Sequence, residues 1–534
     1  MASGHDGHML YAVSALTDAP ELTDVPELDV DVHAAVHTNP HEATPYADAL
    51  DRYIARDPLQ LMVPGHGGSD FGISRRLSEF FGERTLRLDV PMLIDDIDLG
   101  DDSPLDQALA LAADAWGAKR TWFLTNGASQ ANRTVALAVR GLGENVLSQR
   151  SAHSSFSDGV LLAGLTPTFV FPSVDEDNGM AHGVSPAALD TALTAASEAG
   201  QSAAAVYIVS PSYFGSVADV RALSEVAHAH GAPLIVDGAW GPHFGFHPAL
   251  PESPARLGAD LVISSTHKLA GSLTQSAMLH LGDGPFAEQL EPLVERAFAM
   301  TASTSTSALL RASLDIARHA LATGQEAIGQ SIDAAQGFRD QLRADDRFSV
   351  VSDDFERFED IVETDLLRVP IDVSAAGVSG HWVRQRLVDA EGIYLEMSTA
   401  TVVVAVIGAG KAPDLDRVYR ALVAAVESPE AEIERAHHAR SEAFPALPAP
   451  GELRMLPRAG FFAQTEVVPT REAIGRVSAD TLAAYPPGIP NVMPGEEITA
   501  ETVAFLTAVG ASPSGYVRGA IDADVAHMRV VVEG

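Results

Sequence analysis

Residues 261–269 read LVISSTHKL and contain a single lysine, Lys268. The apolar residues 261–263 predict a short buried strand, and the polar residues 264–267 predict a loop that follows it. Lys268 would then lie at the mouth of a sheet, beside hydroxyl groups and an imidazole. Such an amine suits Schiff-base chemistry with a carbonyl compound such as pyridoxal 5'-phosphate (PLP). A surface lysine after a strand would show the same local pattern. The rest of the chain is therefore needed to distinguish a Schiff-base lysine from a surface lysine.

The composition is that of a globular protein with several domains. A length of 534 residues is long for one core and predicts roughly two or three domains. The hydrophobic fraction of 46% and the charged fraction of 20% are ordinary for globular proteins. No apolar run approaches the roughly 20 residues that cross a bilayer, and the first residues lack the basic flank and apolar core of a signal peptide. We therefore expect no membrane partner and a cytoplasmic location.

The absence of cysteine and the acidic balance exclude several kinds of site. Without cysteine there are no disulfides, thiolate metal sites or cysteine nucleophiles. The scattered histidines near the N-terminus lack tight metal-ligand spacing, so no metal site is expected. A net charge of −37 argues against nucleic acid as a partner, because phosphate binding needs clustered Lys and Arg. The charge favours cationic small molecules, although a solvated acidic surface explains it equally well.

Strand and helix patterns alternate between residues 120 and 281. The strands are apolar throughout and are separated by helices of about 10–15 residues, which predicts a mostly parallel α/β sheet. Ligands of such sheets lie beyond the carboxyl ends of the strands. The polar side chains that follow strand ends in this region are Ser129, His153, Ser210, Asp237 and Lys268. We expect all of them on one rim.

Two segments have the pattern of an anion site. Residues 126–129 read NGAS and stand directly before a predicted helix. Small residues with free amides and a hydroxyl at a helix N-terminus would hold a phosphate, here at Ala128 and Ser129. The hydroxyl-rich residues 301–307 precede another helix, and because capping needs only one hydroxyl, they suggest a second contact to an anion.

Asp237 ends one predicted strand and Lys268 follows a later one. The two side chains can therefore reach opposite parts of the ring of one bound cofactor. A carboxylate at the pyridine nitrogen of PLP keeps that nitrogen protonated and makes the ring an electron sink. Ala239 is small enough to lie flat under the ring, and the imidazole of His153 could stack above it. The alternatives are a turn role for Asp237 and a structural role for His153. Glu396 interrupts an apolar strand run and is either solvated or directed at a cationic ligand.

These patterns divide the chain into four parts. We predict an acidic N-terminal arm at residues 1–50, a large cofactor-binding domain at 51–310, a small α/β domain at 311–438 and a C-terminal domain at 439–534. The arm has little periodicity and would be mobile or cover a partner. A Pro- and Ala-rich linker, SEAFPALPAPGEL at residues 441–453, leads into the last domain.

Several ordered segments carry a family resemblance: STHKLAGSLTQSAMLH, SAHSSFSDGVLLAG, VDGAW, STSTSALLRASLD, GIYLEM and the C-terminal block PRAGFFAQTEVVP…AIGRVSA…YPPGIPNVMPGE. Together they resemble the bacterial ornithine/lysine/arginine decarboxylases of the aspartate-aminotransferase fold, over about residues 50–534. The last block is diagnostic, because ordinary aminotransferases lack that domain. The resemblance implies an α/β PLP-dependent transferase of fold type I, with a mostly parallel sheet in the large domain, a small α/β domain and a C-terminal α+β domain.

The resemblance assigns cofactor roles at the expected rim. Lys268 would be the Schiff-base lysine, Asp237 the partner of the pyridine nitrogen and His153 the stacking residue, so these three are the catalytic candidates. The further cofactor contacts that it implies are Ala128, Ser129, Ala239, Trp240, Ser265, His267, Ser303 and Ser305.

The resemblance also implies a substrate residue and a partner. Glu396 matches the acid that receives the distal cationic group of the substrate. Ser303 and Ser305 match a segment that family members contribute to the neighbouring subunit's site, so we expect a homodimer or a higher homo-oligomer with shared active sites.

The chain departs from the family pattern in several places. It reads PGHGG at residues 64–68, where relatives commonly have a lysine after PGH. Thr306 and Ala308 replace a Pro and a Tyr, and Ala128 stands where a hydroxyl residue is common. No segment matches the N-terminal wing of the large inducible enzymes, so their decamer is not expected.

We therefore expect PLP-dependent decarboxylation of lysine, ornithine or arginine to the corresponding diamine or agmatine. Glu396 would select a distal cation, because leaving a buried charge unpaired is costly. The departures keep open another fold type I PLP enzyme that acts on a modified amino acid. A non-catalytic paralogue that regulates an active partner is the remaining alternative, and the retention of Lys268, Asp237 and His153 argues against it.

Overall fold

The computed structural model describes residues 39–91, 94, 96–438, 447–485, 489–512 and 515–532. Most of the predicted arm and the first half of the predicted linker lie outside the described residues. Helix α1 (Pro45–Ala55) begins within the last residues of the predicted arm. Tyr46, Ala49 and Leu50 lie on one face of that helix and are buried, so an apolar stripe holds this segment against the fold.

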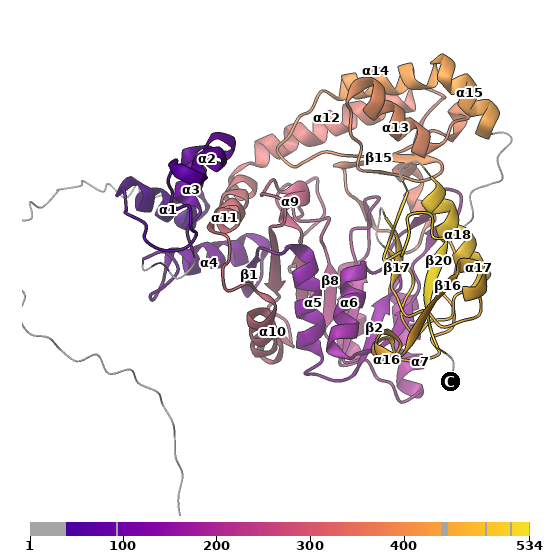
Figure 1. The fold of residues 1–534 in the computed structure, drawn as a ribbon, viewed down its shortest axis with the longest axis horizontal. Helices are drawn as coiled ribbons and strands as arrows, with labels where there is room; N and C mark the ends of the chain where they lie inside the picture. Colours follow the sequence, from indigo (N-terminus) through magenta and orange to yellow (C-terminus); the bar gives the residue numbers. More distant parts are fainter. Residues whose placement is uncertain are drawn as a thin grey trace, which may run out of the picture. The chain divides into compact units, whose positions relative to one another are not determined.

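The large domain is built on a seven-stranded sheet with the order β1-β10-β9-β8-β6-β2-β3 (Figure 1). The strands β9, β8, β6, β2 and β3 run parallel, and β10 is antiparallel to both of its neighbours, so β1 points the same way as β9. The mostly parallel sheet predicted from the apolar strands is confirmed. The bounds are β1 (Arg120–Leu124), β10 (Ala277–Leu281), β9 (Leu261–Ser264), β8 (Leu234–Asp237), β6 (Ala205–Val209), β2 (Asn145–Gln149) and β3 (Thr166–Val170).

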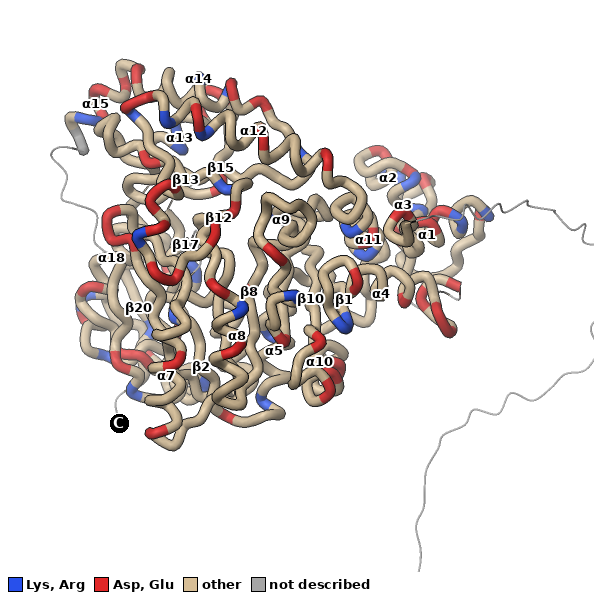
Figure 2. The backbone as a smooth tube through the Cα atoms, turned by 180° about the vertical axis from the view of Figure 1, so that it is seen from behind, with Lys and Arg blue, Asp and Glu red and all other residues tan. Residues whose placement is uncertain are grey.

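Two apolar layers of helices cover the sheet. One face packs against α5 (Gly127–Val139), α6 (Ser154–Ala163) and α10 (Ala287–Thr301), and the other against α7 (Pro186–Glu198) and α8 (Val220–Ala229). Helices α5 and α6 lie in front of the sheet in Figure 1, and α8 lies in front of it in the reverse view of Figure 2. Each fully buried Val or Leu between these layers contributes about 1.5–3 kcal/mol, which fixes the sheet and its carboxyl edge.

The segment around Lys268 differs from the prediction in one respect. Ser264 extends β9 as the partner of Met278, and one turn of helix, α9 (Thr266–Leu269), takes the place of the predicted loop. The backbone N–H of Lys268 donates to the carbonyl of Ser265 over 2.9 Å. Because the turn satisfies backbone groups that a loop would leave to solvent, the lysine starts from a fixed backbone.

Further helices and short strands belong to this part of the chain. Helix α4 (Pro104–Trp116) begins at a capping box in which Ser103 and Asp106 bond each other's backbone N–H groups. Helix α11 (Ala308–Thr323) packs on α1 and α4. The remaining elements of this part are η1 (Pro40–Glu42), η2 (Gly72–Ser74), α2 (Arg75–Phe81), α3 (Glu83–Leu88), β4 (Val174–Asp175), β5 (Met180–Ala181), β7 (Ser216–Val217) and β12 (Glu363–Thr364).

A small antiparallel sheet with the order β11-β13-β15-β14 follows. Its strands are β11 (Ser349–Val350), β13 (Arg368–Asp372), β15 (Val402–Val406) and β14 (Met397–Ser398). The other elements are α12 (Gln325–Arg343), η3 (Val351–Arg357), η4 (Ser374–Ala376), α13 (Gly380–Glu391), α14 (Leu415–Val426) and α15 (Pro429–His438). Met397 of β14, the residue after Glu396, pairs with Val404 of β15.

The C-terminal domain has its own apolar core, which includes Leu506 and Val530. Its strands are β16 (Thr465–Pro469), β17 (Leu482–Tyr485), β18 (Ile489–Val492), β19 (Tyr516–Arg518) and β20 (His527–Val531). Its helices are α16 (Pro457–Phe462), α17 (Thr470–Ala473) and α18 (Ala500–Ala511).

Asp and Glu are spread over helices and loops of every domain rather than gathered in one place (Figure 2). Among the described residues, no helix combines the length and the apolar character needed to cross a membrane.

Candidate functional site

The rim predicted from the sequence forms at the carboxyl edge of the large sheet. Ser129, His153, Ser210, Asp237 and Lys268 follow β1, β2, β6, β8 and β9, which all point in one direction. The hydroxyl of Ser210 accepts a hydrogen bond from the backbone N–H of Ala218 over 3.1 Å and is buried. Ser210 therefore supports the loop, and the other four side chains remain for chemistry.

Asp237 ends β8 as a buried carboxylate with fixed donors. Its Oδ2 accepts hydrogen bonds from the phenol of Tyr207 over 2.5 Å and from the amide of Asn132 over 3.2 Å. Its Oδ1 accepts from the backbone N–H of Ala239 over 3.1 Å. Burial and the charge of Asp237 raise the pKa of Tyr207 well above its ordinary value, so the phenol stays a donor. The sequence identified Asp237 and Ala239 but missed Tyr207 and Asn132.

Lys268 and Trp240 are in direct contact. The Lys268 Nζ lies 3.7 Å from the centre of the Trp240 ring, as in a cation–π pair. Burial lowers the pKa of Lys268 to about 7, and the charge of Arg368 acts in the same direction, whereas Asp237 and Glu396 oppose the shift. Since an ordinary lysine titrates near pH 10, this amine is available in its neutral, nucleophilic form close to neutral pH.

His153 caps helix α6 with its own side chain. Its Nδ1 accepts from the backbone N–H of Ser155 over 3.2 Å and lies 2.8 Å from the Ser155 hydroxyl. Because a backbone N–H can only donate, Nδ1 is unprotonated and the neutral ring carries its proton on Nε2. The amide of Asn132 donates to the same Ser155 hydroxyl over 3.1 Å, so a hydrogen-bond chain joins Asp237 to His153.

Ala128 and Ser129 are half-buried in the first turn of α5, as the anion-site pattern predicts. The turn is held by the backbone N–H of Gly127, which donates to the carbonyl of Gln275 over 2.8 Å. Gly127 has a φ of +72°, which favours glycine at this position. The first turn thus leaves its amides directed at a place where an anion can bind.

Ser265 is the N-cap residue of α9, and His267 lies within its single turn. His267 Nδ1 lies 2.9 Å from the carbonyl of Ser276, which can only accept, so Nδ1 carries the proton. The hydroxyl of Ser265 lies 3.3 Å from the same nitrogen and is buried. Burial lowers the pKa of His267, the bond to Ser276 and the charge of Glu396 oppose that shift, and the charge of Lys268 adds to it.

Glu396 has an exposed side chain and directly precedes β14. Its backbone N–H donates to the carbonyl of Val404 over 3.0 Å, which sets it at the start of β14, and its side chain is exposed. Its charge acts on Lys268, His267 and Arg368, so the carboxylate lies within electrostatic range of these three side chains. The exposed side chain fits the solvated interpretation, and its role toward a cationic ligand stays a prediction.

Ser303 and Ser305 belong to the segment that precedes α11. Both are exposed in the connection between α10 and α11, where the backbone N–H of Ser305 donates to the Ser303 hydroxyl over 3.1 Å. Ser307, and not either of these, caps α11 by accepting from the backbone N–H of Leu310.

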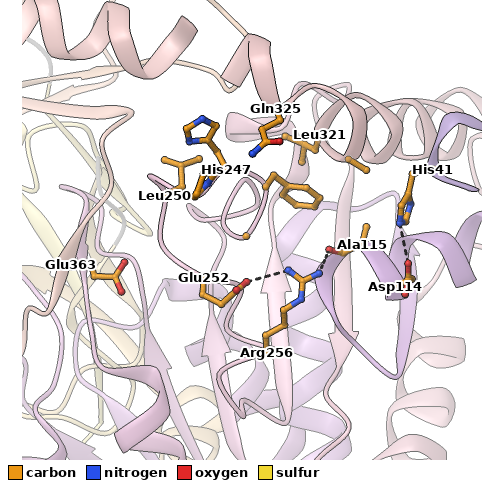
Figure 3. Close-up of a pocket in the computed structure, with 14 residues that line it drawn as sticks. His41, Asp114, Ala115, His247, Leu250, Glu252, Arg256, Leu321, Gln325 and Glu363 are labelled. Carbon is orange, nitrogen blue, oxygen red and sulfur yellow. Dashed lines mark hydrogen bonds and ion pairs between the residues drawn. The ribbon is translucent and has the colours of Figure 1, made fainter. Parts of the chain in front are cut away.

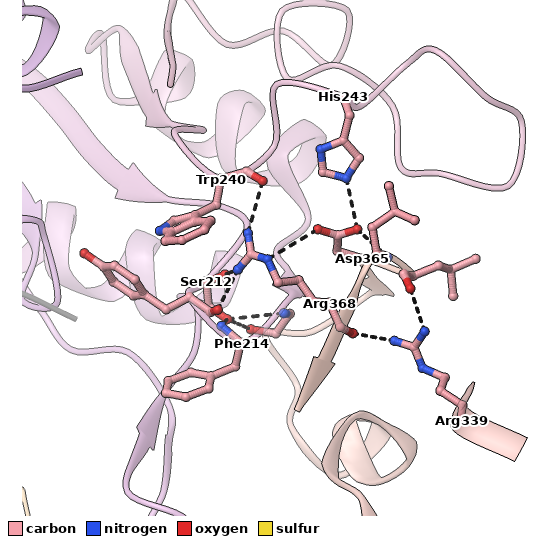
Figure 4. A network of polar contacts seen from close by, with 11 residues as sticks. Ser212, Phe214, Trp240, His243, Arg339, Asp365 and Arg368 are labelled. Atoms are coloured by element: carbon pink, nitrogen blue, oxygen red, sulfur yellow. Dashed lines mark hydrogen bonds and ion pairs between the residues drawn. The ribbon is translucent and has the colours of Figure 1, made fainter. Parts of the chain in front are cut away.

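A buried arginine that the sequence did not reveal joins the small domain to the rim. Arg368, at the start of β13, donates to the carbonyls of Tyr213 over 2.5 Å and Trp240 over 3.2 Å (Figure 4). Its guanidinium carbon lies 4.1 Å from the centre of the Trp240 ring. Asp365 is its counter-ion at 3.9 Å and accepts from His243 over 3.0 Å. In the sequence this arginine is only one charge in the run TDLLRVPIDV, and no local signal marks it.

A cavity of about 720 Å³ lies elsewhere in the fold (Figure 3). Its lining includes Asp114, Phe246, Glu252, Arg256 and Glu363, and Glu252 accepts from Arg256 over 3.2 Å. None of the rim residues named above lines it, so this cavity is separate from the chemistry of Lys268.

The sheet order, the lysine on α9 and the buried carboxylate that ends β8 define an α/β enzyme of fold type I, the fold of PLP-dependent transferases. Comparisons with known proteins give the family. The Orn/Lys/Arg decarboxylase major domain matches residues 44–365, and the Orn/Lys/Arg decarboxylase C-terminal domain matches residues 448–514. The chain belongs to the Orn/Lys/Arg decarboxylase family and is an amino-acid decarboxylase.

Individual relatives agree with this assignment. An arginine decarboxylase of Bacillus subtilis is 34% identical over 470 residues, which cover 87% of this chain and 93% of the relative. A lysine decarboxylase of Pseudomonas aeruginosa is 25% identical over 568 residues, covering 86% of this chain and 75% of the relative. The solved structure of lysine decarboxylase A from Pseudomonas aeruginosa superposes with a TM-score of 0.78 at 22% identity, covering 92% of this chain and 81% of that one.

Proposed function

We propose that this protein is a PLP-dependent decarboxylase of a basic amino acid, with arginine the first substrate to test. The observation that carries the proposal is the arrangement of Lys268, Asp237 and Glu396 around one rim. Arginine comes first because the relatives named arginine decarboxylase reach 34% identity, whereas the lysine decarboxylases cited above and from Hafnia alvei are 25% identical. Lysine and ornithine remain candidates, since an acidic side chain accepts any distal cation.

The residues at the rim fit PLP. The buried Nε1 of Trp240 has no hydrogen-bond partner among the described residues. The site therefore contains an N–H donor that an oxygen atom of a bound ligand could accept from. Ala128, Ser129 and Ser265 would hold the phosphate at the first turn of α5. Ala239 would lie under the ring, and His153 above it.

The chemistry divides among these side chains. When bound, PLP supplies an electron-accepting ring that stabilises the charge left at the substrate Cα after CO2 departs. Asp237, held by Tyr207 and Asn132, would keep a proton on the ring nitrogen. Lys268, with its lowered pKa, would capture and release the cofactor carbonyl near neutral pH. The neutral His153 would cover the ring and exclude water from one face.

Glu396 would orient the substrate from its far end. Its side chain is exposed and its charge acts on Lys268, so the distal guanidinium or ammonium of the substrate would pair with it. A site that provides a charge partner rejects analogues without the cation, because the carboxylate would then be desolvated without compensation. We assign substrate selection to this residue.

We also propose a homodimer with shared active sites. Ser303 and Ser305 are exposed and would contact the cofactor phosphate of the neighbouring subunit. An apolar segment at residues 59–81 supports association, because several of its large side chains are exposed, with Phe71 at 78% and Ile73 at 99%. Monomeric proteins rarely expose a contiguous apolar surface of this kind. The PGHGG loop lies within this segment.

The decisive experiment is CO2 release by the PLP-loaded protein from arginine, lysine and ornithine in separate assays. We expect turnover of one of them, and Lys268→Ala should lower it by about three orders of magnitude or more. Turnover that survives in Lys268→Ala would refute the assigned role of the lysine.

The departures in the PGHGG and STSTSA segments keep a second function open, a fold type I PLP reaction on a modified amino acid. Bound PLP with a visible absorption band, but no CO2 from any of the three amino acids, would favour it over basic amino-acid decarboxylation.

A further inference from the structure

The segment that carries His153 begins at a buried contact with the C-terminal domain. The guanidinium of Arg150 and the carboxylate of Glu496 are 2.8 Å apart, and their side chains are 7% and 1% exposed. The backbone N–H of Met493 donates to the same carboxylate oxygen over 2.9 Å. Separating such a pair leaves an uncompensated buried charge, so Arg150 is fixed where it leaves β2.

A second contact from the C-terminal domain holds the other end of the segment. Arg518, at the end of β19, donates to the hydroxyl of Ser154 and, over 3.3 Å, to the carboxylate of Asp158. Ser154 and Asp158 belong to the first turns of α6, the helix that His153 caps. His153 therefore stands between two residues, Arg150 and Ser154, that the C-terminal domain holds.

The charges around His153 come from four elements. Burial lowers the pKa of His153 to about 4, and the cations of Lys268 and Arg518 act in the same direction. The carboxylates of Asp237 and Asp158 oppose them. Arg518, from the C-terminal domain, therefore helps to keep the imidazole of His153 neutral. The hydrogen bond by which His153 caps α6 requires this neutral state.

We propose that the C-terminal domain positions the imidazole of His153 against the cofactor ring, with Glu496 and Arg518 as positioning residues. The proposal rests on the proposed function, because it needs PLP bound at Lys268. Glu496 fixes the backbone before His153, and Arg518 fixes the helical turn after it. The C-terminal domain thereby acts on cofactor binding without contributing any of the predicted cofactor contacts.

The structure offers a matched pair of arginines for the test. Arg458, on α16 of the C-terminal domain, also contacts α6, but at its far end, where it donates to the carbonyl of Leu162 over 2.8 Å. Arg518→Gln and Arg458→Gln would be made in the full chain, and the PLP dissociation constant would be measured by absorbance titration between pH 5 and 8. Arg518 is 39% exposed, so its replacement is tolerated without a buried cavity.

We expect Arg518→Gln to raise the PLP dissociation constant about tenfold, as the loss of a charge-assisted hydrogen bond would, and Arg458→Gln to leave it unchanged. The titration of Lys268 near pH 7 should be the same in the wild type and in Arg518→Gln, whereas the further loss of PLP affinity that follows His153 near the acid end should begin at a higher pH in Arg518→Gln, because removing a cation raises the pKa of His153. Arg518→Lys should restore part of the affinity.

A double-mutant cycle with His153→Ala tests whether Arg518 acts through the imidazole. In the His153→Ala background, Arg518→Gln should have no further effect on the PLP dissociation constant. Equal effects of Arg518→Gln in both backgrounds, or equal dissociation constants for the two arginine variants, would overturn the proposal. Failure of the wild-type chain to bind PLP at all would instead refute the proposed function.

Discussion

The carboxylate of Glu396 acts on Lys268, and we propose that it also binds the substrate. Its charge opposes the burial that lowers the pKa of Lys268, and its side chain is exposed, so a distal cation could reach it. The charge of Glu396 should therefore affect two measurable quantities, the pKa of Lys268 and the KM for the substrate. The two can be separated because the first is measured on the free protein.

Glu396→Gln should raise the KM for the basic substrate about tenfold to a hundredfold, because a charge-assisted contact is lost. The same change removes a negative charge near Lys268 and should lower the pKa of that lysine further, moving PLP capture to lower pH. Steady-state kinetics and the pH dependence of PLP capture measure the two effects. Glu391→Gln, an exposed glutamate at the end of α13, is the control. An unchanged KM in Glu396→Gln would contradict the substrate role.

At the scale of single elements, strand β10 contributes a buried polar side chain to the core of the large domain. His280 on this strand is fully buried, with its Nδ1 2.8 Å from the Thr121 hydroxyl and its Nε2 3.2 Å from the Ser264 hydroxyl. Its ring stacks on Trp116 at a centroid distance of 5.2 Å. The imidazole thus joins β1, β9 and α4 while it stays neutral.

Burial lowers the pKa of His280 to about 3, whereas an unfolded histidine titrates near 6.5. Below pH of about 6.5 the unfolded chain binds a proton that the folded chain excludes, so the free energy of unfolding falls as the pH decreases toward 3, by about 1.4 kcal/mol per unit for this one group.

His280→Gln should remove that contribution and make the free energy of unfolding less dependent on pH between 6.5 and 4. Urea unfolding of both proteins across this range measures the difference in slope. Parallel pH dependences of the two proteins would show that His280 is not the group responsible.

At the scale of the whole molecule, the segment 59–81 presents several exposed large apolar side chains close together in the sequence. A face of this kind is stable in water when a partner covers it, and the exposed Ser303 and Ser305 are consistent with active sites that are shared across that contact. The dimer and the site are therefore expected to depend on each other.

Ile73→Asp should convert the proposed dimer to a monomer, because it places a charge within the apolar segment. Light scattering after size-exclusion chromatography gives the mass directly. Ile433→Asp provides a control with similar chemistry, since Ile433 is 72% exposed but lies on α15, away from that segment in the chain. A dimer that persists in Ile73→Asp would place the interface elsewhere, and PLP affinity should then remain unchanged as well.

The sequence by itself determined the sheet and its rim. Apolar strands that end in polar residues place Ser129, His153, Asp237 and Lys268 at one edge, because parallel strands bring their carboxyl ends together. The helical turn at Lys268 was missed, since Ser264 and Thr266 have the composition of a loop and only the pairing with Met278 extends the strand.

Only the tertiary structure decided which distant side chains hold the rim residues in place. Tyr207 and Asn132 hold Asp237, Arg368 fixes the loop of Trp240, and Arg518 reaches Ser154 across 364 residues of sequence. Local periodicity reports which face of a strand or helix is buried, and nothing in it specifies which distant side chain arrives there. Contacts of this kind form when separate domains pack, so they follow from the fold and not from any single stretch of the chain.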